Sequence, residues 1–294
     1  MKIAFIGAIE FSRRTLELLI EMDQDIVGVC TLKDSPFNAD HYDLAALCKK
    51  KNIPWAYTPN INSAESIKWL TVKKPDVIFC FGWSKLLGDK VLNLASIGVV
   101  GYHPAALPAN RGRHPLIWAL CLGLKETAST FFFMDKGADS GDILSQLKIE
   151  ISDEDNATTL YEKITLCALS QIKIFIPQLE ARTFSRKPQD HKQANIWRKR
   201  NNADGEIDWR MSAMSIHNLV RSLAKPYPGA HFIFKKKEIT VWRSMIVQNY
   251  STNIEPGKII AIGKNGEPLI RCGDQAIQLL KTELKHNFNI GEYL

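Results

Sequence analysis

Two side chains suited to proton transfer follow consecutive predicted strands in the middle of the chain. His103 follows the apolar run 97–102, and Asp139 lies in a glycine-rich turn after the apolar run 130–134. An imidazole changes its charge near neutral pH, and a carboxylate can orient it or favour its charged form. Open α/β sheets place their functional sites just beyond the carboxyl ends of the strands. The two segments therefore predict a site that moves a proton.

Other polar residues lie close to this pair, and their types leave several roles open. The glycine-rich turn also holds Asp135 and Asp142, and from the chemistry alone any of its three aspartates could be the base. Arg111 and Arg113 follow His103 in the same loop. They either bridge carbonyls and carboxylates of the loops or contact an anionic substrate.

The composition predicts a folded protein with a basic surface. The 294 residues are 45% hydrophobic and 23% charged, which suits one large domain and a small one. The net charge is +7, and much of the excess lies in 182–200, beside a predicted linker. This clustering favours a solvated linker over a nucleic-acid footprint, so we expect no nucleic-acid partner.

The cysteines and the apolar runs indicate the compartment. The six cysteines lie far apart, mostly in apolar runs, and form no CxxC pair. They predict buried thiols in a reducing compartment, with neither disulfides nor a metal site. No apolar run approaches the roughly 20 residues of a membrane span, and the N-terminus begins with strand residues rather than a signal peptide. We therefore expect a cytoplasmic protein with no membrane partner.

Hydrophobic patterning predicts two kinds of domain. Apolar runs and helical periodicity alternate from residue 1 to 179, which predicts a Rossmann-like, mostly parallel sheet with helices on both faces. Five short apolar runs between 231 and 283 predict a small β-rich, OB-like barrel that follows one helix. We expect a catalytic domain at 1–182, a linker at 183–206 and a C-terminal domain at 207–294.

The loops around His103 and Asp139 resemble those of the formyltransferase family that uses 10-formyltetrahydrofolate. HPAALPANRG is similar to the family's histidine loop, H-x-S-L-L-P-x-x-R-G, and MDKGADSGDIL is similar to its aspartate loop, D-x-G-x-D-x-G-D. Asp139 follows His103 by 36 residues, the family's usual distance, and 207–230 is similar to the segment that joins the family's two domains. The resemblance covers nearly the whole chain and selects His103 and Asp139 as catalytic.

The resemblance implies an enzyme that moves a formyl group from 10-formyltetrahydrofolate to an amine, without a metal. His103 would transfer the proton, and Asp139 would orient the imidazole or deprotonate the amine. The folate-binding candidates are Phe81, Gly82, Trp83, Ser84, Leu86, Asp135 and Asp142. The substrate-binding candidates are Glu10, Arg13, Arg111, Gly112, Arg113, His114 and Tyr227.

One position departs from the family pattern. The family has an asparagine two residues before the catalytic histidine, and this chain has Gly101 there. That asparagine would donate a hydrogen bond to the developing oxyanion, so another donor is needed. The candidates are Asn110, His114, Ser140 and backbone N–H groups, and Asn110 carries the same amide chemistry. We expect a changed but active site.

The amine acceptor is predicted from two further segments. GRHPLIWAL and KETASTFFFMD resemble enzymes that act on nucleotide-linked deoxyamino sugars of surface polysaccharide or pseudaminic-acid-type biosynthesis. The alternative acceptor is methionyl-tRNA, whose enzymes have a basic insertion after the second strand. Here that connection reads KDSPFNADHYD, and its three aspartates are wrong for phosphate contacts. A second alternative is a non-catalytic protein that binds folate or a sugar nucleotide. The sequence does not indicate whether the nucleotide is UDP or dTDP. It does not determine the oligomeric state either, and a homodimer is the state that we consider.

Overall fold

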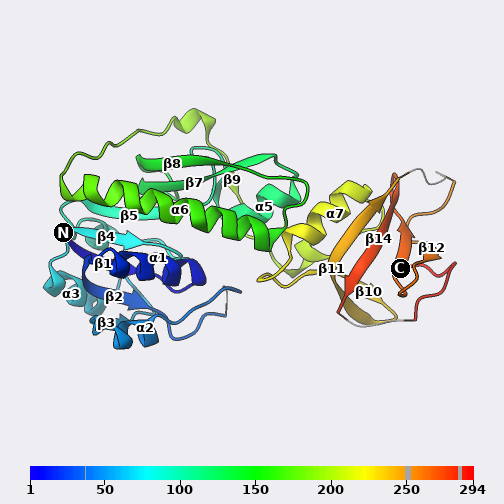
Figure 1. The fold of residues 1–294 in the computed structure, drawn as a ribbon, viewed down its shortest axis with the longest axis horizontal. Helices are drawn as coiled ribbons and strands as arrows, with labels where there is room; N and C mark the ends of the chain where they lie inside the picture. The colour runs from blue at the N-terminus through cyan, green and yellow to red at the C-terminus, as the bar shows by residue number, and fades with distance from the viewer. Residues whose placement is uncertain (37, 249–252, 284–286) are drawn as a thin grey trace. The chain divides into compact units, whose positions relative to one another are not determined.

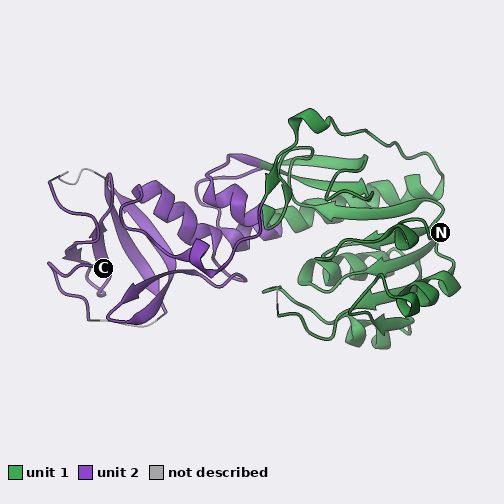
Figure 2. Ribbon diagram, turned by 180° about the vertical axis from the view of Figure 1, so that it is seen from behind, with its two compact units in different colours: residues 1–115, 127–149, 163–197 green, residues 116–126, 150–162, 198–294 purple. Residues whose placement is uncertain are grey.

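Two compact units make up the protein, and their segments interleave along the chain. The computed structural model describes residues 1–36, 38–248, 253–283 and 287–294. Unit 1 contains Met1–Pro115, Thr127–Ile149 and Lys163–Trp197. Unit 2 contains Leu116–Glu126, Glu150–Glu162 and Arg198–Leu294 (Figure 2).

Unit 1 is built on a seven-stranded sheet with the order β3-β2-β1-β4-β5-β7-β8 (Figure 1). The strands are β1 (Lys2–Ile6), β2 (Asp25–Thr31), β3 (Trp55–Tyr57), β4 (Val77–Cys80), β5 (Gly98–His103), β7 (Glu126–Phe133) and β8 (Ile143–Glu150). The first five pair in parallel, whereas β7 runs antiparallel to β5. The predicted mostly parallel sheet is therefore confirmed.

Helices cover both faces of this sheet, as alternate side chains of the central strands show. They are α1 (Glu10–Glu21), α2 (Ala45–Lys50), α3 (Ala64–Lys73), α4 (Asp89–Leu92) and the part of α6 (Ala157–Glu180) that belongs to unit 1, from Lys163 on. On one face, Phe79 of β4 packs against Phe175 of α6, and Phe11 of α1 packs against Phe81. On the other face, Ile78 of β4 shares a buried cluster with residues of α3 and α4. The central strands are continuous apolar runs because both of their faces are buried.

Unit 2 contains an antiparallel sheet, the helix that precedes it in the chain, nearly all of α5 (Pro115–Cys121) and the first residues of α6. The helix is α7 (Ala213–Ser222), and the strands are β10 (Ala230–Phe234), β11 (Lys237–Val247), β12 (Ile259–Ile262), β13 (Pro268–Arg271) and β14 (Ala276–Thr282). Their order in the sheet is β10-β11-β14-β13-β12. Residues of α7 and of these strands share one hydrophobic core. The predicted strand-rich C-terminal domain is confirmed.

The segment predicted as a linker, 183–206, carries defined structure. It contains two 3-10 helices, η1 (His191–Gln193) and η2 (Asn202–Gly205), and the short strand β9 (Ile196–Trp197). Within unit 1, β9 pairs in parallel with β6 (Arg111–Gly112). The predicted linker was bounded by its polar composition, whereas the compact units are bounded by contacts between residues. The polar stretch is therefore shared between the two units, with unit 1 ending at Trp197 and unit 2 resuming at Arg198.

Candidate active site

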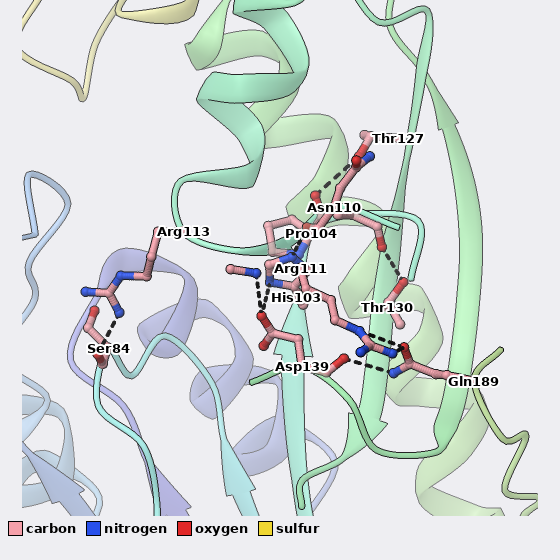
Figure 3. A network of polar contacts seen from close by, with 12 residues as sticks. Ser84, His103, Pro104, Asn110, Arg111, Arg113, Thr127, Thr130, Asp139 and Gln189 are labelled. Atoms are coloured by element: carbon pink, nitrogen blue, oxygen red, sulfur yellow. Dashed lines mark hydrogen bonds and ion pairs between the residues drawn. The ribbon is translucent and has the colours of Figure 1, made fainter. Parts of the chain in front are cut away.

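His103 ends β5 with its side chain almost fully buried, at 4% exposure. Its Nε2 lies 2.7 Å from the backbone carbonyl oxygen of Asn110. A carbonyl oxygen only accepts hydrogen bonds, so Nε2 carries a proton and donates it. In the neutral ring, Nδ1 is then the unprotonated nitrogen, and it lies 3.6 Å from Oδ2 of Asp139 (Figure 3). Nδ1 is therefore the atom of this ring that can accept a proton.

Asp139 is held by the loop that follows His103. Its backbone φ is +54°, a left-handed value that is uncommon for aspartate. The backbone N–H of Gly112 donates to Asp139 Oδ2 over 2.9 Å. One carboxylate oxygen thus faces both the histidine loop and the His103 ring, which places the carboxylate where an imidazolium charge would form.

The other two aspartates of the turn have different surroundings. Oδ1 of Asp135 accepts hydrogen bonds from the N–H of Gly137 at 3.0 Å and from the hydroxyl of Ser140 at 2.6 Å. Asp142 accepts through its backbone carbonyl from the N–H of Phe133 at 2.8 Å. Among the three aspartates of the turn, ion-pair geometry with His103 is found for Asp139. The folate-binding roles of Asp135 and Asp142 stay predictions.

Asn110 contributes to the site through its backbone. Its φ is +64°, its carbonyl accepts from His103, and its N–H donates to Oδ1 of Asn195 over 2.7 Å. These contacts fix the ring nitrogen of His103 that carries the proton. The oxyanion-donor role of the Asn110 amide stays a prediction, as does that of His114, which also has a left-handed φ of +55°.

The predicted substrate-binding arginines have protein partners. Arg111, 7% exposed, donates through Nε and Nη2 to Oε1 of Gln189. Arg113 Nη1 donates to the carbonyl of Ser84 over 2.7 Å, and Arg13 forms ion pairs with Glu10 and Glu17. Of the two readings of Arg111, the observed contacts are those of a bridge between loops. The substrate roles of these residues stay predictions.

Several of the folate-binding candidates lie around a cavity of about 150 Å³. Its lining includes Gly82, Trp83, Ser84, Gly101, Met134 and Asp139. Of the other folate-binding candidates, Phe81 is fully buried and Leu86 is 62% exposed. The substrate-binding candidate Tyr227 packs against the core of unit 2. Trp83 Nε1 is a buried donor with no hydrogen-bond partner among the residues that the structure describes. A bound acceptor group could satisfy it.

Two further ionisable side chains line the cavity, and burial keeps both of them neutral. Burial raises the pKa of the Cys80 thiol and the pKa of the Tyr102 hydroxyl far above neutral pH. The Tyr102 hydroxyl also forms a hydrogen bond with that of Ser129 at 3.0 Å. Neither side chain is therefore suited to act as a nucleophile or a base, and the proton-transfer roles of His103 and Asp139 stay predictions.

Gly101 is in van der Waals contact with a side chain that fills the space beside it. A Cβ atom at this position would lie 2.8 Å from Cγ of Met134 and 3.0 Å from Cζ of Phe132. The space that an asparagine would need is therefore occupied by a thioether side chain and an aromatic ring. Met134 and Gly101 line the same cavity, so its lining is apolar at the position where the resemblance implies an amide.

We expect Gly101→Asn to destabilise the protein by about 1–3 kcal/mol without raising kcat, because the new side chain overpacks the wall. Denaturant unfolding and steady-state kinetics measure the two effects. Gly101→Asn combined with Met134→Ala should recover much of the lost stability. A single variant that is as stable as the wild type and much faster would show that the site lacks a donor.

Two residues of the site, Gln189 and Asn195, are not among the sequence-based candidates. Both lie in the segment predicted as a linker, yet they contact Arg111 and Asn110 of the histidine loop. Their residue types carry no sign of this role, because glutamine and asparagine are common in polar connections. The pairing of β9 with β6 brings them to the site, and that pairing has no pattern in the sequence.

The fold is of the α/β class, with a His–Asp pair between the loops that follow β5 and β7, and comparisons with known proteins identify the family. A family model described as formyl transferase matches residues 1–171, and the model of the family's C-terminal domain matches 199–294. The chain therefore belongs to the formyl transferase family and is an N-formyltransferase.

Three relatives match this chain over nearly its whole length. A methionyl-tRNA formyltransferase of Acetivibrio thermocellus is 29% identical over 300 residues, which cover 100% of this chain and 96% of that protein. The sugar 3N-formyl transferase WlaRD, solved with dTDP and 5-N-formyl-THF, has a TM-score of 0.71 at 17% identity, covering 97% and 99% of the two chains. An N-formyltransferase of Helicobacter canadensis, solved with folinic acid and dTDP-3-aminofucose, has a TM-score of 0.70 at 17% identity, covering 95% and 98%.

The structure also bears on metals and membranes. Within the described ranges, no three His, Cys, Asp or Glu side chains are grouped so that they could hold a metal ion. None of the helices in those ranges has the length and apolar character needed to cross a bilayer.

Proposed function

We propose that the protein transfers a formyl group from 10-formyltetrahydrofolate to the amino group of a nucleotide-linked deoxyamino sugar. The two structural neighbours described above were solved with folate derivatives and with dTDP or a dTDP-linked amino sugar. The proposal for the acceptor depends chiefly on the acidic connection 33–43, whose Asn38 lines the cavity. The proposal for the chemistry depends on Nδ1 of His103 and its partner Asp139.

The cavity offers features that fit a folate. The orphaned indole N–H of Trp83 is a buried donor on its wall, suited to an acceptor of a heterocyclic ring. The apolar side chains of Met134 and Phe132 supply a surface for a flat ring. When bound, the folate supplies a formyl carbon that is open to attack by an amine. Trp83, Ser84 and their neighbours would hold it beside the His103–Asp139 pair.

The protein's part in the reaction is the movement of one proton. An alkyl amine is mostly protonated at pH 7 and is nucleophilic only when neutral. Nδ1 of His103 accepts the ammonium proton, and Asp139 Oδ2 stabilises the imidazolium. The amine nitrogen then forms a bond to the formyl carbon and releases its second proton to water, and the bond from that carbon to the folate nitrogen breaks. His103 returns its proton to this leaving nitrogen through the same Nδ1, because Nε2 stays bonded to the Asn110 carbonyl.

The acidic connection supports a small acceptor over a tRNA. Oδ1 of Asn38 accepts a hydrogen bond from the Ser84 hydroxyl over 3.1 Å, and Asn38 lines the cavity. The carbonyl of Asp40 accepts from the N–H of Glu10, so the connection is held against the start of α1. Its three aspartates would repel the phosphates of an RNA strand at this edge of the cavity.

A screen of nucleotide-linked amino sugars tests the proposal. UDP- and dTDP-linked amino sugars are each incubated with the enzyme and 10-formyltetrahydrofolate, and products are read as the mass gain of one formyl group. The His103→Asn variant is the matched control. Formylation of at least one amino sugar by the wild type alone supports the proposal, and formylation of none across the set contradicts it.

Methionyl-tRNA formylation is the second candidate, because the Acetivibrio thermocellus relative with that name matches the whole chain. We nevertheless expect no productive binding of initiator methionyl-tRNA, given the acidic connection 33–43. Filter binding at moderate salt measures this directly, with a known tRNA-binding formyltransferase as the positive control. Tight retention that falls as salt increases would favour the tRNA acceptor instead.

A further inference from the structure

A polar segment that is remote in the sequence crosses both loops of the site. Residues 187–197, here called the return segment, lie about 50 residues beyond the glycine-rich turn that holds Asp139, here called the aspartate turn. Lys187 and Ile143 exchange two backbone hydrogen bonds at one end, and β9 pairs with β6 at the other. Between these anchors, the return segment contacts the histidine loop and the aspartate turn at the same time.

Gln189 makes both of these contacts with one amide group. Its Oε1 accepts from Arg111 Nε at 3.2 Å and from Arg111 Nη2 at 2.6 Å. Its Nε2 donates to the backbone carbonyls of Asp139 at 3.0 Å and Gly141 at 2.7 Å (Figure 3). Gln189 is only 7% exposed. All four hydrogen-bonding positions of its amide are filled.

The hydrogen bonds of Gln189 reach both segments that carry the His103–Asp139 pair. Asp139 has a strained left-handed φ, so its turn needs external contacts to stay in one conformation. Gly112, which follows Arg111 in β6, donates its N–H to the Asp139 carboxylate. Gln189 thus binds the backbone of Asp139 directly. Through Arg111 it also holds β6, the strand whose Gly112 binds the Asp139 side chain.

We propose that Gln189 is a positioning residue, which sets the distance between Asp139 Oδ2 and His103 Nδ1 by joining the aspartate turn to the histidine loop. The inference rests on the proposed function, because it takes this pair as the proton-transfer pair. The charged and ionisable groups that the network joins to His103 are Asp139, Arg111 and His191, whose Nδ1 accepts from Arg111 at 3.0 Å.

An amide is better suited to this position than a carboxylate. A glutamate would still accept from Arg111, but it would place an acceptor against the two carbonyls that Nε2 now binds. The turn would lose both of its donors, while the buried guanidinium would keep its partner. Gln189→Glu therefore loosens Asp139 without leaving Arg111 unpaired.

Gln189→Glu is expected to lower kcat by about 10–100-fold, the effect of a misplaced catalytic group, while KM for the folate changes little. Gln171→Glu is the matched control, because Gln171 is 1% exposed and its Nε2 also donates twice, to Ser129 O and Ser145 Oγ. It should change stability without lowering kcat by more than about threefold. In an Asp139→Asn background, Gln189→Glu should have little further effect on kcat, because both changes act through one carboxylate.

A second readout needs no substrate, so it separates this inference from the proposed function. Hydrogen exchange of the Gly112 amide, followed by NMR, should become about tenfold faster in Gln189→Glu, because the turn that presents Oδ2 to this amide loosens. The exchange rate should not change in Gln171→Glu. If Gln189→Glu does not fold, Gln189→Asn, which keeps the amide on a shorter side chain, serves both measurements. Wild-type kcat and exchange in a folded Gln189 variant, equal losses in Gln171→Glu, or additive losses with Asp139→Asn would each overturn the inference.

Discussion

His103→Asn is expected to leave the fold intact and to lower kcat by about 10²–10⁴-fold, the usual effect of removing a general acid–base. The asparagine amide reaches only to the position of Nδ1 and is too short to replace the bond from Nε2 to the Asn110 carbonyl, so a modest loss of stability should accompany the intact fold. The amide offers no group in place of Nδ1 that can accept a proton at neutral pH. The acceptor amine would then stay charged and unreactive.

Steady-state kinetics with 10-formyltetrahydrofolate and a nucleotide-linked amino sugar that the wild type formylates measures this change, and circular dichroism checks the fold. Raising the pH gives a further test, because an amine that is already neutral does not need the base. The deficit of the variant should therefore shrink as the pH approaches the pKa of the substrate amine. A kcat like that of the wild type at pH 7 would remove His103 from the mechanism.

Asp139→Asn is expected to have an effect of similar size, about 10²–10⁴-fold in kcat. An amide carries no negative charge, so it stabilises the imidazolium of His103 far less than the carboxylate does. The Gly112 N–H can still find an oxygen acceptor on the new side chain, which preserves the loop contact. The loss should therefore appear in kcat rather than in stability.

Asp135→Asn is the matched control for this prediction. Asp135 lies in the same turn, but its contacts are with Gly137 and Ser140 rather than with His103. We expect a milder change in kcat than for Asp139→Asn when both variants are measured at saturating folate. The reverse order would assign the carboxylate role to Asp135 instead.

Much of the fold follows from patterns that act over short distances. Continuous apolar runs such as 2–6 and 76–81 form strands with both faces buried, because parallel sheets between two helical layers need them. The five strands of unit 2 lie between Ala230 and Thr282, close to the predicted span 231–283. His103 and Asp139 were selected by a resemblance over two motifs, whereas residue chemistry alone left three aspartates open.

The contacts between distant segments could not be predicted in the same way. The return segment has a polar, basic composition typical of a linker, yet Gln189 and Asn195 lie in it and hold the site loops. The space at Gly101 is another example, because the sequence shows that a side chain is missing there but not that Met134 fills the gap.

The physical reason is that pattern and composition report local preference and burial, whereas a catalytic distance depends on which loops pack together. The residues of 97–103 and 130–139 indicate a histidine and a carboxylate at the ends of neighbouring strands. The nitrogen of His103 that faces Asp139 depends on the Asn110 carbonyl, 2.7 Å from the other ring nitrogen. The same Asn110 has a left-handed φ and donates its N–H to Asn195, which lies 85 residues later in the chain.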